Sequence, residues 1–199
     1  IVNGTTNYML SRMSGEGLGY AEALAEAQAM GFAEADPTMD VGGADAAQKI
    51  SLLASLAFGT WVDWTKVLCE GITTVGAKDI VFARSAGFEF KLLAAATEID
   101  GRPLVTVYPA MVPVDHPLAA VRGEVNGVMV DSDFLGPSVY QGRGAGGRPT
   151  ASSIASDLGD LARIIVAGPA SRPRMPGFAR RELQAAENEV LRHRSGLGG

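Results

Sequence analysis

The stretch FEFKLLAAATEIDGRPLVTVYPAMV, residues 88–112, decides the fold of this chain. Its two parts, Phe88–Ile99 and Leu104–Val112, are rich in apolar residues, and Asp100-Gly101 lies between them. An Asp-Gly pair between two such runs is a strong signal for a tight hairpin turn, because both residues tolerate positive φ angles. We therefore predict two antiparallel strands joined by a short turn.

Helix signals flank this hairpin on both sides. Ahead of it, segments rich in good helix formers begin at capping residues or end at glycines. These predicted helices cover residues 8–13, 20–30, 45–58 and 77–86, with a loop over residues 32–44. Behind it, we predict a turn at Asn126-Gly127, a strand at Val128–Val130, a helix over residues 150–167 and a polar helix over residues 179–194. Helices come first, strands next and then a helix, an order that predicts an α+β fold rather than βαβ alternation.

The composition of the chain argues against several partners and against a disulfide-stabilised fold. The 199 residues carry 17 Lys+Arg against 22 Asp+Glu, a formal net charge of −5, so nucleic acid is not expected as a partner. No run of about 20 apolar residues is present, so no membrane partner is expected either. A single cysteine rules out an internal disulfide framework and fits a cytoplasmic location. The chain starts at Ile1 without a Met or a leader pattern, so we expect it to be incomplete.

The predicted helix over residues 45–58 carries an unusual pair of charges. On a helical wheel Asp45 and Lys49 share one narrow stripe with Leu52 and Leu56, next to an apolar stripe, while the serines lie on the other side. Both charges are therefore predicted to lie in the apolar arc, where a charge is costly unless it is paired or used. A purely structural ion pair between residues four apart, with the lysine reaching solvent, is the alternative interpretation.

Three further carboxylates precede this helix. They are Glu34, Asp36 and Asp40, and with Asp45 they form a predicted acidic cluster. Such a cluster favours a cationic ligand, either the ammonium group of a substrate or a metal ion. The metal ion is the less favoured of the two, because no histidine is near and Lys49 would repel the cation. We therefore assign no metal ligands.

Several motifs together resemble the catalytic region of the homoserine dehydrogenase family. They are Asn3-Gly4-Thr5-Thr6-Asn7-Tyr8, Gly31-Phe32-Ala33-Glu34-Ala35-Asp36-Pro37, Asp40, Asp45-Ala46-Ala47-Gln48-Lys49, Gly142-Arg143-Gly144-Ala145-Gly146-Gly147 and Pro149-Thr150-Ala151-Ser152. The resemblance covers about residues 1–167. It implies NAD(P)-dependent interconversion of aspartate-4-semialdehyde and homoserine in threonine, methionine and isoleucine biosynthesis, with NADP or NAD as the cofactor.

The resemblance also implies roles for individual residues. Lys49 would handle the proton at the substrate oxygen, with Asp45 supporting it. Substrate binding would fall to five residues: Gly4 and Thr5 on the substrate carboxylate, Glu34 on its ammonium group, Asp40 as a further acid, and Phe32, where the family often has Tyr. Gly144 and Ala145 resemble a segment close to the cofactor, because glycine permits close approach of the backbone to a phosphate. The alternative for this glycine-rich run is a tight connection from strand to helix.

The family resemblance completes the predicted organisation. We expect an α+β fold with a mixed β-sheet and helices packed on one face, plus the C-terminal returning segment of an incomplete Rossmann-type domain. Residues 1–138 would form the substrate-binding, catalytic and dimerisation domain, residues 139–168 the segment returning to the nucleotide-binding domain, and residues 169–199 a polar tail, partly disordered. No strand followed by G-x-G-x-x-G is present, so the main cofactor-binding half would lie upstream. Family members form dimers or tetramers, and in isolation this chain would be a non-catalytic dimerisation and substrate-binding module.

Overall fold

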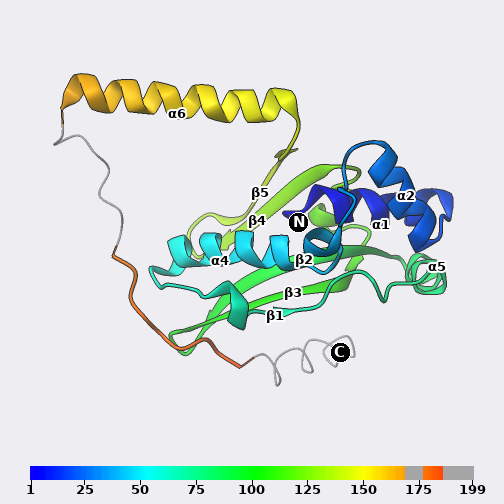
Figure 1. Cartoon of the computed structure of the whole chain (residues 1–199). Coiled ribbons are helices and arrows are strands. Elements are labelled where there is room, and N and C mark those ends of the chain that lie inside the picture. The colour runs from blue at the N-terminus through cyan, green and yellow to red at the C-terminus, as the bar shows by residue number, and fades with distance from the viewer. Residues whose placement is uncertain (169–176, 186–199) are drawn as a thin grey trace.

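The computed structural model describes residues 1–168 and 177–185. Five helices form the first half of the chain, and one long helix stands apart near its end (Figure 1). They are α1 (Gly4–Glu16), α2 (Tyr20–Ala29), α3 (Thr38–Val41), α4 (Ala44–Phe58), α5 (Ala77–Ser85) and α6 (Gly147–Ala167), with short 3-10 turns η1 (Trp64–Lys66) and η2 (Pro117–Ala120). Among the described residues, no helix is long and apolar enough to cross a bilayer.

A mixed three-stranded sheet forms the centre of the molecule. Its order is β1 (Leu68–Cys69), β3 (Arg102–Pro113), β2 (Phe88–Ile99), with β1 parallel and β2 antiparallel to β3. The turn between β2 and β3 is made by Asp100 at φ 50° and Gly101 at φ 74°. Positive φ at both positions matches the right-handed twist of the strands, so the predicted hairpin is confirmed. The predicted α+β fold is confirmed with it.

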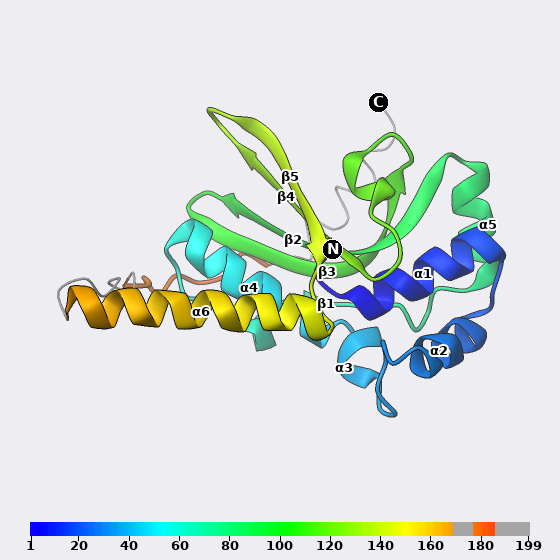
Figure 2. The same cartoon turned by 90° about the horizontal axis from the view of Figure 1, so that it is seen from above.

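Helices α1 and α4 pack against β2 of this sheet, and α4 also crosses β3 (Figure 2). The main core lies between them and is built from small and medium apolar side chains, including Met9, Leu10, Met13, Ala46, Ala47, Ile50, Ala54, Leu92, Val105 and Val107. On α4, alanines and serines face the sheet, so the helix lies close to the strands. This places the first turns of α1 and α4 near each other, where the candidate site lies.

The buried face of α4 differs from the one predicted. Ser51 and Ser55 are buried, because their hydroxyls donate at 2.7 Å to the carbonyls four residues earlier and need no water. Leu52 and Leu56 are about 60% exposed. The prediction that the Asp45–Leu56 stripe lies in the buried apolar arc is therefore wrong for this chain. A helical wheel predicts the buried side of a helix from polarity alone. Here α4 packs so closely on the sheet that small side chains, serines included, occupy its buried side.

A second hairpin, β4 (Val125–Ser132) and β5 (Gly136–Arg143), forms a separate two-stranded sheet. The turn predicted at Asn126-Gly127 is wrong, since both residues lie inside β4 and the chain reverses after Ser132. Gly127 instead exchanges two backbone hydrogen bonds of 2.8 Å with Ile1. A Cβ at Gly127 would lie 2.7 Å from a methyl group of Val121, so this glycine serves a close approach rather than a turn.

Residues 32–44 contain one helical turn, α3, where a loop was predicted. Asp36 accepts hydrogen bonds from the backbone nitrogen and the hydroxyl of Thr38, at 3.1 and 2.5 Å, which fixes the start of the turn. The turn then holds Asp40 in a defined position. Apart from the helix predicted over residues 179–194, the remaining predicted helices are confirmed with shifts at their ends, the largest of which extends α1 back from residue 8 to Gly4.

Residues 177–185 run beside the core without forming a helix. Ala179 bridges the Gly59–Trp61 segment, the Gln184 nitrogen donates to the Pro103 carbonyl at 2.8 Å, and Leu183 packs on the core. The predicted polar helix over residues 179–194 is therefore absent in residues 179–185. The rest of that helix, and the tail predicted to be partly disordered at residues 169–176 and 186–199, lie outside the described residues.

Substituting Gly71 tests how α3 is held in place. A Cβ at Gly71 would lie 2.0 Å from the Val41 carbonyl oxygen and 2.6 Å from the Gly42 Cα, so backbone must move. We expect Gly71→Ala to lower the free energy of unfolding by about 1–3 kcal/mol. The matched control is Gly15→Ala inside α1, where nothing lies within 4 Å and alanine favours the helix by about 0.5–1 kcal/mol. Urea unfolding measures both, and equal effects would contradict this packing.

Candidate functional site

The candidate site is organised by Asn3, which caps the N-terminus of α1. Its side-chain oxygen accepts hydrogen bonds of 2.9 Å from the backbone nitrogen and the hydroxyl of Thr6. Its side-chain nitrogen Nδ2 donates to Asp40 at 2.7 Å and to Asp45 at 2.9 Å. One amide thus joins the start of α1 to carboxylates from α3 and α4.

Lys49 extends this arrangement by one helical turn. Its ammonium lies 2.7 Å from Asp45 Oδ2 and 3.1 Å from the Val2 carbonyl oxygen. The Lys49 side chain is 47% exposed and that of Asp45 27% exposed. Asp40, Asn3, Asp45 and Lys49 therefore form a connected row of alternating hydrogen-bond acceptors and donors, and its Asp45–Lys49 end is partly open to solvent.

The remaining predicted substrate-binding residues fall into two groups. Thr5 is buried, and its hydroxyl donates to the Phe32 carbonyl oxygen at 2.6 Å, so these two positions lie together beside the start of α1. Gly4 begins α1, and a Cβ there would lie 2.9 Å from the Glu124 carbonyl oxygen. Glu34 is exposed in the segment after α2, where its carbonyl oxygen accepts from Gln28 at 3.0 Å.

The predicted convergence of four carboxylates is wrong. Only Asp40 and Asp45 share a partner, while Asp36 bonds to Thr38 within its own turn. Within residues 1–168 and 177–185, no group of three or more His, Cys, Asp and Glu side chains is arranged to hold a metal ion. The four acids lie within a dozen positions in the sequence, but only Asp40 and Asp45 are joined, through Asn3.

Gly144 and Ala145 lie exposed between β5 and α6. A Cβ at Gly144 would lie 2.0 Å from Asn126 Nδ2, so a side chain at this position would require the Asn126 amide to move. The other amide atom, Asn126 Oδ1, is buried and has no hydrogen-bond partner among the described residues. Arg143 pairs with Glu124 at 3.0 Å, and Glu124 in turn lies against Gly4. The glycine-rich segment is thereby connected to the start of α1.

Two residues of this region were not singled out from the sequence. The position of Asn3 before a helix-forming segment is compatible with a helix cap, but nothing in the sequence indicates its contact with two distant acids. Lys91 on β2 is 2% exposed, and its ammonium donates to Asn7 Oδ1 at 3.2 Å and to the Val121 carbonyl oxygen. A lysine within a strand is ordinary in a sequence, so no pattern marks it as buried.

Burial gives Lys91 a measurable effect on stability. Desolvation lowers the pKa of Lys91 from 10.5 to about 8, with Glu89 opposing and Arg122 reinforcing the shift. The unfolded chain therefore binds more protons than the folded chain between pH 8 and 10.5, and stability due to Lys91 rises with pH across this window. We therefore compare the unfolding free energy of the wild type with that of Lys91→Met. We expect the difference, wild type minus variant, to rise by up to about 3 kcal/mol between pH 8 and pH 10.5. A flat difference in denaturant titrations at pH 8 and 10.5 would contradict this.

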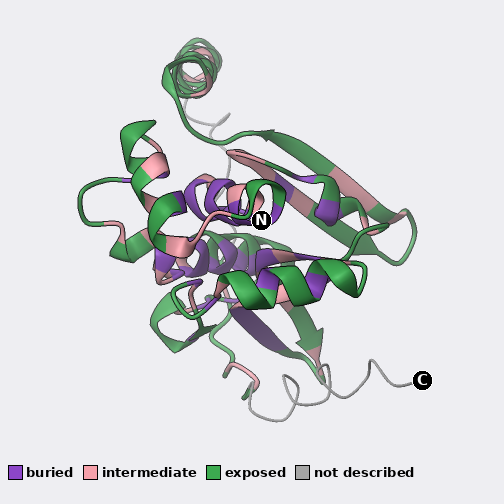
Figure 3. Cartoon of the chain, turned by 90° about the vertical axis from the view of Figure 1, so that its right-hand side faces the viewer, coloured by how far each residue is buried: buried purple, intermediate pink, exposed green. Residues whose placement is uncertain are grey.

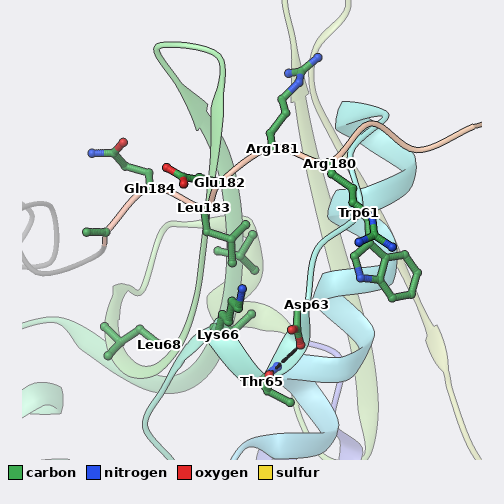
Figure 4. Close-up of a pocket in the computed structure, with 13 residues that line it drawn as sticks. Trp61, Asp63, Thr65, Lys66, Leu68, Arg180, Arg181, Glu182, Leu183 and Gln184 are labelled. Atoms are coloured by element: carbon green, nitrogen blue, oxygen red, sulfur yellow. Dashed lines mark hydrogen bonds between the residues drawn. The ribbon is translucent and has the colours of Figure 1, made fainter.

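A cavity of about 1020 Å³ lies elsewhere, between the η1–β1 segment and residues 180–185 (Figure 4). Trp61, Lys66 and Leu183 are among its lining residues. None of the predicted site residues lines this cavity. The cavity lies beyond the C-terminal end of α4, whereas Asp45 and Lys49 lie in the first turns of that helix. This cavity is therefore not the candidate site.

Comparison with known proteins assigns the family. A family model described as homoserine dehydrogenase matches residues 1–158. The chain belongs to the homoserine dehydrogenase family. Among curated relatives, the homoserine dehydrogenase of Synechocystis sp. is 50% identical over 169 residues, which are 83% of this chain and 39% of the relative. The homoserine dehydrogenase of Pseudomonas aeruginosa is 43% identical over 172 residues, 86% of this chain and 40% of the relative.

Solved structures agree with the family assignment. A homoserine dehydrogenase from Thiobacillus denitrificans is similar with a TM-score of 0.88 at 37% identity, covering 94% of this chain and 44% of that one. A hyperthermophilic archaeal homoserine dehydrogenase in complex with NADPH gives a TM-score of 0.65 at 28% identity, covering 87% and 47%. The chain thus spans 39–47% of the length of these family members.

Proposed function

We propose that this chain is the substrate-binding and catalytic part of a homoserine dehydrogenase, which interconverts aspartate-4-semialdehyde and homoserine. The observation that carries the proposal is the single amide of Asn3 bonded to both Asp40 and Asp45, with Lys49 on the second of them. An amino-acid substrate has an ammonium group and a hydroxyl or aldehyde oxygen, and this row offers carboxylates for the first and an ammonium for the second.

The proton at the substrate oxygen is assigned to Lys49. In the reducing direction, the aldehyde carbon gains a hydride and its oxygen gains a proton from the Lys49 ammonium, giving the alcohol; the oxidising direction returns both. The nicotinamide cofactor supplies or accepts the hydride when bound. Asp45 holds Lys49 by the 2.7 Å ion pair, and Asn3 donates to the same carboxylate oxygen, Asp45 Oδ2, at 2.9 Å, so the pair is oriented before substrate arrives.

Binding of the substrate is assigned to the start of α1 and its surroundings. Gly4 and Thr5 occupy the first turn, where free backbone N–H groups and the helix dipole favour a carboxylate. Asp40, Glu34 and the Phe32 carbonyl segment would receive the ammonium group. Of these, Glu34 is exposed and would have to turn toward the substrate.

The glycine-rich segment fits a nicotinamide cofactor, NADP or NAD. The exposed backbone at Gly144 and Ala145 permits close approach, and the partnerless Asn126 Oδ1 beside them is an acceptor suited to an amide or hydroxyl donor. Helix α6 follows at once, and none of its residues is buried (Figure 3). Its apolar stripe of Ile154, Leu158, Leu161 and Ile165 is 54–77% exposed, which supports the proposal that residues 139–168 return to a nucleotide-binding domain.

Activity is tested on an extended protein, in which the part of a family member that precedes the matched segment is fused ahead of Ile1. We expect homoserine-dependent reduction of NADP⁺ or NAD⁺, followed at the absorbance of the reduced nicotinamide. The control is Lys49→Met in the same protein. Absence of turnover in an extended protein that is folded and binds the cofactor would contradict the proposed activity.

The chain spans only about two fifths of the length of its curated relatives, which favours a second candidate function for the 199-residue chain by itself. As an isolated piece it would be a non-catalytic module that binds substrate and forms a homodimer or tetramer. Calorimetry on the 199-residue chain separates the two: homoserine binding without NADP⁺ binding supports the module, and binding of both supports a self-sufficient enzyme. Cytoplasmic location belongs to the same proposal, because the single cysteine, Cys69, is free and exposed.

A further inference from the structure

One face of α1 is polar although it is largely removed from solvent, with Asn7 and Ser14 buried and Ser11 half-buried. Asn7, Ser11 and Ser14 recur at helical spacing and all bond outside their own turn. Ser11 accepts from the Gly123 nitrogen at 3.1 Å, and Ser14 donates to Glu89 at 2.6 Å. A buried polar stripe must be fully paired to be tolerated, so its partners define how α1 sits on the sheet.

Asn7 is the centre of this stripe. Its Nδ2 lies 3.2, 3.0 and 3.0 Å from the carbonyl oxygens of Val121, Gly123 and Val125. A side-chain amide has two N–H groups, so it cannot serve three carbonyl groups in full. Lys91 supplies further N–H donors: its ammonium bonds to the Val121 carbonyl and also to Asn7 Oδ1. The two side chains together hold one short backbone segment.

The backbone segment over residues 121–127 packs against the start of α1. The Glu124 carbonyl oxygen lies 2.9 Å from the position of a Cβ on Gly4, and Gly127 exchanges two backbone bonds of 2.8 Å with Ile1. Residues 121–127 therefore contact the chain on both sides of Asn3. A shift of residues 121–127 would therefore move Asn3 and Thr5 relative to the carboxylates on α3 and α4, which are those of Asp40 and Asp45.

We propose that Lys91 is a positioning residue that holds residues 121–125 against α1 and thereby sets the place of Asn3, Gly4 and Thr5. The side chain is 2% exposed, so it cannot reach substrate or exchange protons with it. The charged groups nearest to it are Glu89, Arg122 and the amino group of Ile1, and Glu89 is itself paired with Arg122 at 3.1 Å. Lys91 thus acts on the hydrogen-bond network rather than as half of an ion pair.

Kinetics of Lys91→Met in the extended protein test the proposal, with the exposed Lys78→Met on α5 as the matched control. Methionine keeps the length of the side chain and removes its donors. If Asn3, Gly4 and Thr5 are displaced, we expect KM for homoserine to rise about tenfold or more while kcat stays within threefold of the wild type. A fall in kcat without a change in KM, or no change in either, overturns the proposal.

Two further measurements keep the test decisive. Ser11→Ala removes the acceptor of the Gly123 nitrogen at the edge of the network, so it should raise KM by a smaller factor even if Lys91→Met folds poorly.

The inference rests on the proposed function only for the KM measurements, which need an active enzyme. Hydrogen exchange of the 199-residue chain needs no turnover: Lys91→Met should speed exchange in residues 1–10 and 121–127, and Lys78→Met should not. Unchanged exchange there overturns the proposal, whereas an inactive wild type with faster exchange in the variant overturns only the function.

Discussion

Replacing Lys49 by methionine is expected to lower kcat for homoserine oxidation about 10²- to 10⁴-fold in the extended protein. The variant keeps the length of the side chain and loses the ammonium that lies 2.7 Å from Asp45. Lys49 is half exposed in this chain and packs little, so the fold should survive the change.

The same substitution at Lys78, an exposed lysine on α5, is the control and should leave kcat unchanged. Steady-state rates at saturating homoserine and cofactor measure both variants, with circular dichroism to verify folding. A Lys49→Met protein with kcat within threefold of the wild type would show that the proton at the substrate oxygen is handled elsewhere.

Asn3→Ser is expected to raise KM for homoserine about 10- to 100-fold. Serine is as good a helix cap as asparagine, so α1 keeps its N-terminal support. The shorter side chain loses the donor that bonds to Asp40 at 2.7 Å and to Asp45 at 2.9 Å. Hydrogen bonds to charged groups contribute about 1.5–3 kcal/mol each, and without them the two carboxylates repel each other and move apart.

Thermal unfolding separates this effect from a loss of stability. We expect the melting temperature of Asn3→Ser to stay close to that of the wild type, because the cap is retained. An unchanged KM would mean that the two acids are held in place without Asn3. A large fall in melting temperature with KM unchanged would make Asn3 a cap and nothing more.

Local signals in the sequence predicted most of the elements. Asp100-Gly101 predicted the central hairpin because only a few residue types adopt two successive positive φ angles. Asn126-Gly127 carried the same kind of signal and misled, because there the glycine makes room for Val121 and for pairing with Ile1. Only the packing of distant segments distinguishes these two uses of glycine.

In the candidate site, too, local contacts could be predicted from the sequence and long-range contacts could not. The ion pair between Asp45 and Lys49 follows from a spacing of four residues on a helix, and it is present. Which acid joins it does not follow from spacing: Asp40 does, through Asn3, while Asp36 closes its own turn. The buried face of α4 was also not predictable, since Ser51 and Ser55 satisfy their hydroxyls within the helix. These contacts depend on tertiary structure, which a pattern along one element does not contain.

Discrimination between homoserine and 2-aminobutyrate, which lacks the hydroxyl, tests the central claim most directly. If the Asp45–Lys49 pair binds the substrate oxygen, calorimetry on the wild-type extended protein should show homoserine binding about tenfold or more tighter than 2-aminobutyrate. Lys49→Met should bind both ligands with nearly equal affinity, while Lys78→Met keeps the wild-type ratio. A Lys49→Met protein that retains the full preference for homoserine would contradict the assignment of this pair to the substrate oxygen.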